Sequence, residues 1–314
     1  MFQYTFNNHF KYAYRGKDYF AEKTKEDDVF LAEYTQPVTK DLVSWRESNL
    51  LAARLIYERK IGEINILLSG GMDSEVCLRS FAEQKLNFRA VSLLLKGCEE
   101  TDDMKQIEQL KSEFSFKHEY VFLEPIQFLE SKTFIETMDL VKCVSPIIGS
   151  HLWLANQVGG TPIIAQGEVH LRKEVNDDYV PGISPYVDSP WYILESERRF
   201  SIYLNFIKKN IPGVPGFFQY LPEQVHTFLV YNEYLKKLIT NSISGKLGTR
   251  SSKNIIIKQF YPNLQDREKK HGWEKIIDIH DHYRSFFGER FKNFNNLYRM
   301  PLDKTILTLR GNAF

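Results

Sequence analysis

Short apolar runs alternate with longer amphipathic stretches through the middle of the chain. This pattern predicts a buried strand at Ile64–Leu68, a second apolar strand at Ala90–Leu95, and two further strands at Glu119–Leu123 and Pro162–Ala165. Helices are expected between them, over Ser74–Gln84, about 101–114 and Ile147–Gln157. Strands and helices that alternate at this length predict an α/β fold, a parallel sheet with helices on both faces. A ligand site is then expected at the carboxyl ends of the strands.

The two flanks of this region show other patterns. Aromatic and polar residues alternate in residues 2–36 around Asn7-Asn8, which predicts a β-hairpin or a small antiparallel sheet. A helix over about 39–60, with Thr39 as its cap, should follow. Beyond residue 176, prolines and aromatic residues predict a mainly helical region, with helices near 195–209, 223–240 and 272–288 and a polar, flexible segment at 241–252. We therefore expect three segments, at 1–60, 61–175 and 176–314.

The composition is that of an ordinary globular protein. The 314 residues are 43% apolar and 26% charged, with a net charge of +1, so no nucleic-acid or membrane partner is required. The aromatic share of 14% is compatible with a bulky core or with a homo-oligomer interface. Cys77, Cys98 and Cys143 are widely spaced, which favours a reducing compartment. Since the chain shows no signal-peptide pattern and no apolar run of membrane-spanning length, a cytoplasmic location is expected.

The chemistry is concentrated in the segment Ser69-Gly70-Gly71-Met72-Asp73-Ser74, between the first buried strand and the helix after it. Hydroxyls, bare glycine amides and a helix N-terminus together suit a phosphate group. Glycine turns also follow strands where no ligand binds, but here the whole strand–loop–helix context agrees. Walker and dinucleotide-binding glycine patterns are absent. Because Asp73 would repel bare phosphate, we interpret it as a Mg²⁺ ligand and expect Mg-ATP.

The Ser-Gly-Gly-x-Asp-Ser pattern resembles the pyrophosphate-binding loop of the N-type ATP pyrophosphatases, the PP-loop or adenine nucleotide alpha hydrolase-like superfamily. That superfamily includes asparagine synthetases, NAD synthetases and tRNA-modifying enzymes. The resemblance implies a Rossmann-like nucleotide domain at 61–175 and cleavage of ATP between its α and β phosphates. It also implies that the loop residues Ser69, Gly70, Gly71, Asp73 and Ser74 hold Mg-pyrophosphate. Adenine would lie against the backbone of Leu67, Leu68, Ser92 and Leu93.

Gln166-Gly167-Glu168 resembles the Gly-Glu-Gly-x-Asp-Glu segment of asparagine and β-lactam synthetases. The resemblance implies that Gly167 lies by the nucleotide and that Glu168 serves in acid/base chemistry; a solvated carboxylate is the alternative. His170 and Arg172 are substrate contacts or surface polar residues. The chain departs from the family pattern at Val169, Leu171 and Arg172, which leaves a second Mg²⁺ ligand open, with Glu174, Asp177 or Asp178 as alternatives.

The segment from Lys253 to Gly272 loosely resembles the Lys…Pro…Arg-x-Lys-x-Gly tail of asparagine synthetases. This resemblance makes Lys258, Arg267 and Lys269 candidates for a cationic clamp on the phosphates. A solvated charge run explains any one of them equally well. His280-Asp281-His282 does not predict a metal site, because positions i and i+2 of a helix do not share a face.

The function predicted from these patterns is an AMP- and pyrophosphate-forming ligase or amidotransferase. It would adenylate a small-molecule acid or carbonyl and couple it to an amine or ammonia. The glutaminase of asparagine synthetases needs a cysteine after the initiator Met, but Phe2 stands there and only about 60 residues precede the nucleotide segment. We therefore expect no glutaminase activity. The alternatives are a tRNA- or nucleobase-modifying enzyme, although the basic clusters are sparse, and a non-catalytic nucleotide-binding protein.

Overall fold

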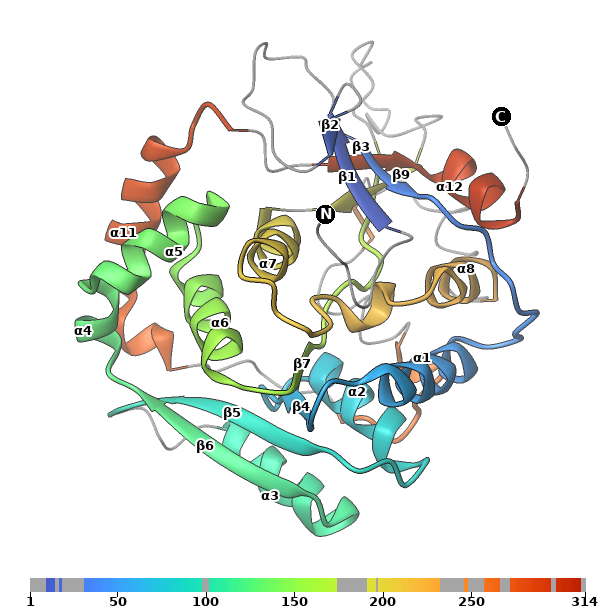
Figure 1. The fold of residues 1–314 in the computed structure, drawn as a ribbon, viewed down its shortest axis with the longest axis horizontal. Coiled ribbons are helices and arrows are strands. Elements are labelled where there is room, and N and C mark those ends of the chain that lie inside the picture. The colour runs from blue at the N-terminus through green and yellow to red at the C-terminus, as the bar shows by residue number, and fades with distance from the viewer. Residues whose placement is uncertain are drawn as a thin grey trace, which may run out of the picture.

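The computed structural model describes residues 10–14, 17–18, 31–97, 102–173, 191–195, 197–231, 246–247, 257–265, 272–294 and 298–311. These residues form a mixed α/β fold with two sheets. In the view of Figure 1 the parallel sheet lies at the lower edge and strands of the second sheet lie at the top. Helices α6, α7 and α8 lie between them in this view, and the candidate site is built where the parallel sheet ends.

The parallel sheet confirms the four strands predicted from the apolar runs. It contains β4 (Ile64–Leu67), β5 (Arg89–Leu95), β6 (Lys117–Leu123) and β7 (Thr161–Ile164), in the order β6-β5-β4-β7. All three pairings are parallel. Strands β4 and β7 are almost wholly buried, which is typical of a parallel sheet covered on both faces.

Helices flank this sheet largely as expected. Helices α2 (Met72–Ala82), α3 (Asp102–Phe114) and α6 (Pro146–Gln157) match the prediction within a few residues. Helices α4 (Pro125–Leu129) and α5 (Lys132–Val141) were not predicted. The α5 sequence does carry a signal, because its buried residues Phe134, Met138 and Val141 follow helical spacing.

Helix α1 (Trp45–Arg59) begins later than predicted. Its N-cap is Ser44, whose side chain accepts a hydrogen bond from the backbone N–H of Glu47 at 3.1 Å. The Glu47 carboxylate in turn accepts from the backbone N–H of Val43, the residue before the cap, at 3.0 Å. Thr39 is not the cap, because its backbone N–H and hydroxyl both donate to Glu223, at 2.8 and 3.0 Å.

The second sheet was only partly predicted. Its order is β10-β8-β9-β11-β3-β1-β2. The antiparallel pairing of β1 (Phe10–Tyr14) with β2 (Lys17–Asp18) and β3 (Leu31–Tyr34) confirms a small N-terminal sheet, whereas the strand expected before Asn7 lies outside the described residues. Its other strands, β8 (Leu171–Lys173), β9 (Trp191–Glu195), β10 (Lys246–Leu247) and β11 (Tyr298–Pro301), were not expected. The sheet thus draws strands from all three expected segments.

The later part of the chain is helical, as predicted. It contains α7 (Glu197–Lys208), α8 (Pro222–Val230), α11 (Ile277–Arg290), α12 (Leu302–Leu309) and two short 3₁₀ turns, η1 (Phe217–Gln219) and η2 (Trp273–Ile276). Of the polar segment 241–252 only β10 is described. No helix within the described ranges is long and apolar enough to cross a membrane.

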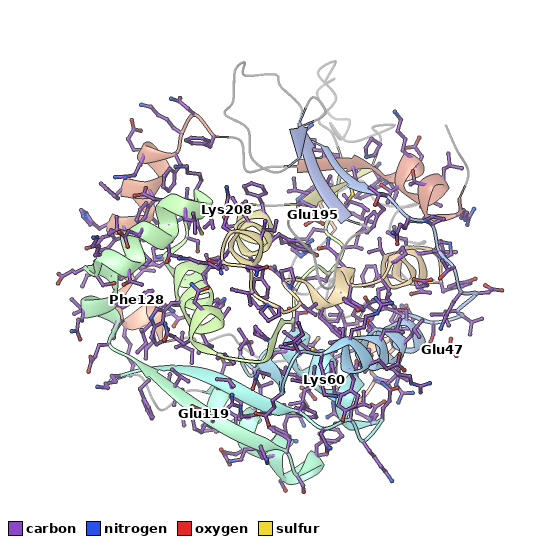
Figure 2. All side chains as sticks on the ribbon, viewed as in Figure 1. Glu47, Lys60, Glu119, Phe128, Glu195 and Lys208 are labelled. Atoms are coloured by element: carbon purple, nitrogen blue, oxygen red, sulfur yellow. The ribbon has the colours of Figure 1, made fainter. Side chains whose placement is uncertain are left out.

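Aromatic side chains from distant parts of the chain form the core beside α1. Trp45 packs against Phe218, Phe228, Phe260 and Tyr261, with ring centroids 5.1 to 6.0 Å apart. Phe218 is buried, so the aromatic residues of η1 belong to the core rather than to a pocket wall. Figure 2 shows Glu195 at the inner part of the molecule, whereas Glu47 and Glu119 lie toward its edge.

Candidate functional site

The loop between β4 and α2 is held by its own two serines. The Ser74 hydroxyl accepts from the Ser69 backbone N–H at 3.2 Å and donates to the Gly71 carbonyl at 2.9 Å. The Ser69 hydroxyl lies 3.2 Å from that of Ser74 and accepts from the Gly71 N–H at 3.4 Å. Gly71 is the N-cap of α2 and makes no side-chain cap bond. The positive end of α2 therefore begins at this loop, which suits an anion.

Gly70 brings the loop into contact with the start of α3. Its φ is +73°, a region that side chains disfavour. A Cβ placed on Gly70 would lie 2.7 Å from the carbonyl oxygen of Asp103 and 2.8 Å from the Asp103 Cα. Glycine is thus needed at position 70 both for the positive φ and for the close approach of the Asp103 backbone. As a result, Asp103 is placed beside the phosphate-type loop.

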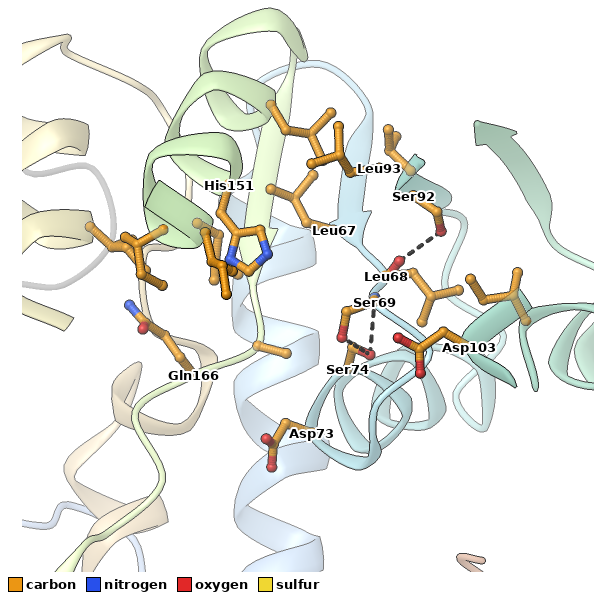
Figure 3. A pocket seen from close by; sticks show the side chains of 18 of the residues that line it. Leu67, Leu68, Ser69, Asp73, Ser74, Ser92, Leu93, Asp103, His151 and Gln166 are labelled. Carbon is orange, nitrogen blue, oxygen red and sulfur yellow. Dashed lines mark hydrogen bonds between the residues drawn. The ribbon is translucent and has the colours of Figure 1, made fainter. Parts of the chain in front are cut away.

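A cavity of about 330 Å³ opens at the carboxyl ends of β4, β5 and β7. Figure 3 shows the loop serines at its centre, Asp73 and Asp103 on either side of Ser74, and His151 and Gln166 on the opposite wall. The predicted residues that line this cavity are Leu67, Leu68, Ser69, Asp73, Ser74, Ser92, Leu93 and Glu168. Gly70 and Gly71 connect the lining residues of the loop, and Gly167 directly precedes Glu168. The structure therefore brings the expected nucleotide residues to one site.

The side chain of Ser92 fastens three neighbouring strands. Its hydroxyl donates to the Leu68 carbonyl at 2.7 Å and lies 2.9 Å from Nε2 of His118 on β6. Because the Ser92 proton is used on Leu68, Ser92 accepts from His118. Burial, helped by Lys111, lowers the pKa of His118 to about 4, so the ring is neutral near pH 7. This bond network fixes the strand ends on which the loop stands.

Glu168 lies at the cavity wall among charged partners. Its carboxylate is 12% exposed and lies 3.3 Å from Nε2 of His170 and 3.7 Å from Nη2 of Arg199. The Glu168 carbonyl also accepts a short hydrogen bond from Arg199. Gly167 has a φ of +97°, and a Cβ there would lie 2.8 Å from the side chain of Gln219. Glu168 is therefore fixed at the cavity by its neighbours and is not a solvated surface carboxylate.

Of the predicted cationic clamp, the structure describes only Lys258. Lys258 does not line the cavity, and the neighbouring Tyr261 packs on Trp45 of α1 instead. Arg267 and Lys269 lie outside the described residues, as do Glu174, Asp177 and Asp178. Their roles stay predictions. Arg172 also does not line the cavity, whereas His170 does.

Sequence reasoning missed four polar or aromatic residues of the cavity, Asp103, His151, Arg199 and Trp273. Asp103 could have been found, because it lies in the first turn of the helix after the second parallel strand, and that helix starts at the ligand edge of the sheet. Arg199 and Trp273 carried no local signal, since they reach the site only through the packing of α7 and η2.

Comparisons with known proteins give no match to a family model and no match to a curated protein sequence. Among solved structures, the chain is similar to a predicted subunit of tRNA methyltransferase from Methanocaldococcus jannaschii, with a TM-score of 0.27 and 19% identity over 48% of this chain and 66% of that one. It is also similar to NH3-dependent NAD synthetase from Campylobacter jejuni, with a TM-score of 0.29 and 16% identity over 72% of this chain and all of that one. These likenesses carry no functional argument, so function must be argued from the site.

Proposed function

We propose that the protein is an ATP-dependent, AMP- and pyrophosphate-forming ligase that joins an acid or carbonyl substrate to a nitrogen nucleophile. One observation supports this most strongly. The Ser69–Ser74 loop, at the start of α2, and Glu168 line the same cavity. A phosphate-binding loop and a carboxylate facing one cavity suit the activation of one substrate by ATP and the transfer of a proton from another.

The loop would hold the pyrophosphate part of ATP. The hydroxyls of Ser69 and Ser74 and the N-terminus of α2 supply donors and positive potential there. The adenine would lie against the backbone at Leu67, Leu68, Ser92 and Leu93, which line the apolar part of the cavity. We further propose that residues 61–175 hold the nucleotide and that residues 176–314 help to hold the acceptor. Arg199, Ile202 and Trp273 of the latter segment also line the cavity.

The donor set at the loop fits Mg²⁺. The carboxylates of Asp73 and Asp103 line the cavity on either side of Ser74. The described residues contain no preassembled group of three or more His, Cys, Asp or Glu side chains for a metal. Mg²⁺ suits such a site, because it is commonly bound by one or two carboxylates together with substrate phosphates and water. When bound, the ion would offset negative charge on the phosphates.

The proposed reaction has two steps. An oxygen of the acid attacks the α phosphorus of ATP, the bond from that phosphorus to the bridging oxygen breaks, and pyrophosphate leaves. The amine nitrogen then attacks the activated carbon, the bond to AMP breaks, and the nitrogen loses a proton. Glu168 would accept that proton, since its carboxylate lies at the cavity wall.

The test is to identify the products of ATP. The purified protein is incubated with Mg-ATP, ammonium and pools of small carboxylic acids, and nucleotides and phosphates are resolved by ³¹P NMR. We expect AMP and pyrophosphate to appear together and to depend on the acid. Formation of ADP and phosphate instead would contradict the proposal.

A matched pair of variants checks that the loop is responsible. Asp73→Ala should weaken Mg-ATP binding and lower pyrophosphate release at least tenfold, which corresponds to about 1.4 kcal/mol. Asp278→Ala is the control, because Asp278 is an exposed aspartate in the first turn of another helix, α11. If Asp73→Ala and Asp278→Ala bind Mg-ATP equally well in calorimetry, the loop is not the nucleotide site.

A further inference from the structure

A buried ion pair lies directly behind the Glu168 wall of the cavity. Glu195, at the end of β9, is fully buried, and Arg199, in the first turns of α7, is 5% exposed. The Arg199 Nη1 lies 3.0 Å from both carboxylate oxygens of Glu195. Removing two charges from water is unfavourable, and a pair like this one stabilises a protein less than its distance suggests. Stability alone therefore does not explain why this ion pair lies beside the cavity.

Further polar groups satisfy the buried carboxylate. The Gln219 side-chain amide donates to Glu195 at 2.7 Å, and the Tyr203 hydroxyl donates to the Gln219 oxygen at 3.3 Å. Burial raises the pKa of Glu195, and the charge of Arg199 opposes this shift. Burial and the nearby Glu195 charge also raise the pKa of Tyr34, which keeps that phenol neutral. Arg199 is consequently the cation that balances Glu195.

The same groups connect back to Glu168 by two routes. Arg199 donates to the Glu168 carbonyl and lies 3.7 Å from its carboxylate. Gln219 packs against Gly167, so closely that a Cβ on that glycine would lie 2.8 Å from its side chain. A continuous chain of contacts therefore runs from Glu168 through Arg199, Glu195 and Gln219 to Gly167, the neighbour of Glu168. Glu168 is thereby held from both sides.

Arg199 is also shared between two carboxylates. Its contact with Glu195 is the closer one, at 3.0 Å against 3.7 Å for Glu168. Other titratable groups that face Glu168 are His170, from the segment before β8, at 3.3 Å, and Glu195, whose negative charge repels that of Glu168. Any change that releases Arg199 from Glu195 leaves more of its positive charge to Glu168, because one cation serves both.

We propose that Glu195 is a positioning residue for Glu168 and acts through Arg199. By holding one edge of the guanidinium, Glu195 fixes the backbone of Glu168 at the cavity wall and limits how far Arg199 neutralises its carboxylate. Glu168 then stays available as a proton acceptor. The use of that acceptor rests on the proposed ligase function, but the positioning itself does not.

The test follows the protonation of Glu168 directly. The protein is labelled with ¹³C at the glutamate carboxyl carbons, and Glu168→Gln identifies the Glu168 signal. In Glu195→Gln the shape is kept and the negative charge is lost, so Arg199 interacts more strongly with Glu168. We expect Glu168 to titrate about one pH unit lower than in the wild type.

A double variant must shift the titration the other way. Glu195→Gln with Arg199→Gln removes both charges of the pair, so that no buried charge is left without its partner. Glu168 then loses the positive charge of Arg199 and should titrate above the wild-type value. A role in stability alone does not predict opposite shifts. If Glu195→Gln does not fold, Glu195→Asp replaces it: the shorter side chain keeps its charge but draws back from Arg199, and Glu168 should again titrate below the wild-type value.

Glu119→Gln is the matched control. Glu119 is also a strand glutamate paired with an arginine, at 2.7 Å from Arg89, but it is half-exposed on β6. This variant should leave the Glu168 titration unchanged. Equal Glu168 titration in the wild type and the double variant, or a shift in the same direction in the single and the double variant, would overturn the proposal.

The titration needs no turnover, so its outcome is separate from that of the ligase proposal. If the wild type forms no AMP and pyrophosphate, the ligase function fails while the titration still tests the positioning. If the wild type is active, Glu195→Gln should lower kcat about tenfold and leave the KM for ATP unchanged, because a weaker base slows proton transfer without touching the nucleotide loop.

Discussion

Gly70, in the loop, and Gly97, outside it, both have a positive φ, so comparing them separates backbone strain from lack of space. Gly70 and Gly97 have φ values of +73° and +79°. A Cβ on Gly70 would lie 2.7 Å from the Asp103 carbonyl oxygen, whereas one on Gly97 would meet nothing within 4 Å. The two positions therefore share the conformational strain of an added side chain and differ in the space around it.

We predict different losses for the two alanine variants. Gly97→Ala should lower the free energy of unfolding by about 1–2 kcal/mol, the strain of a left-handed residue. Gly70→Ala should lose a further ~1–3 kcal/mol, because the loop and α3 must move apart. It should also bind Mg-ATP more weakly, while Gly97→Ala should not. Urea denaturation and calorimetry measure both effects, and equal losses in the two variants contradict the close approach at Gly70.

Among single residues, those of the Ser69–Ser74 loop could be predicted from the sequence, but their contacts with distant parts of the chain could not. Serine, glycine and aspartate between a buried strand and a helix are a local signal, so Ser69, Asp73 and Ser74 could be named from the sequence. The approach of Asp103 to Gly70 depends on how α3 docks. Thr39 fails as a cap for a similar reason, because Glu223 from α8 takes its donors while Ser44 caps α1.

Among the elements, the strands β4, β5 and β6 are joined, at the carboxyl end of β4, by the bonds of Leu68, Ser92 and His118. The His118 ring has a pKa of about 4 in the folded protein, below its ordinary value of 6.5. Between these values the unfolded chain binds a proton that the folded protein does not bind. As pH falls from about 6.5 to about 4, proton uptake thus favours unfolding, and stability decreases.

We predict that His118→Gln makes this acid-side loss of stability smaller, because glutamine does not titrate and can still donate to Ser92. Urea denaturation at intervals from pH 7 to pH 4 gives the slope for the wild type and the variant. His282→Gln is the control, since His282 is exposed on α11. Should the wild type and His118→Gln lose stability in parallel, protonation of His118 does not contribute.

The elements differ in how far the sequence predicts them. The parallel sheet was predictable because β4, β5 and β7 are buried and rich in apolar residues, and amphipathic helices lie between the strands along the chain. The second sheet was not, because β2 and β10 have two residues each and β8 has three. Such short strands have no period of their own and are defined by partners far along the chain, as when Arg299 pairs with Leu31.

For the molecule as a whole, β11, from the C-terminal part of the chain, lies between β3, from the N-terminal part, and β9, which carries Glu195. Arg299 at its centre pairs with Leu31 of β3 on one side and with Leu194 of β9 on the other. Its neighbour Tyr298 is in register with Glu195, the buried anchor of Arg199. Helix α12 then returns the chain to its N-terminal part, where the Val38 N–H donates to the Leu309 carbonyl at 2.8 Å. The second sheet therefore supports the Glu168 wall of the cavity.

We predict that breaking β11 disturbs this wall from a distance. Arg299→Pro removes a ladder donor from a central strand and should lower the free energy of unfolding by about 3 kcal/mol or more. Arg299→Ala is the matched control, because it keeps the backbone donor and removes side-chain contacts such as that of the guanidinium with the Tyr192 ring, at 4.9 Å, which is typically worth about 0.5–1 kcal/mol. Amide hydrogen exchange should quicken in β3 and β9 for the proline variant alone, and the Glu168 titration should change with it. If both variants exchange alike, the sheet does not transmit strain to the cavity.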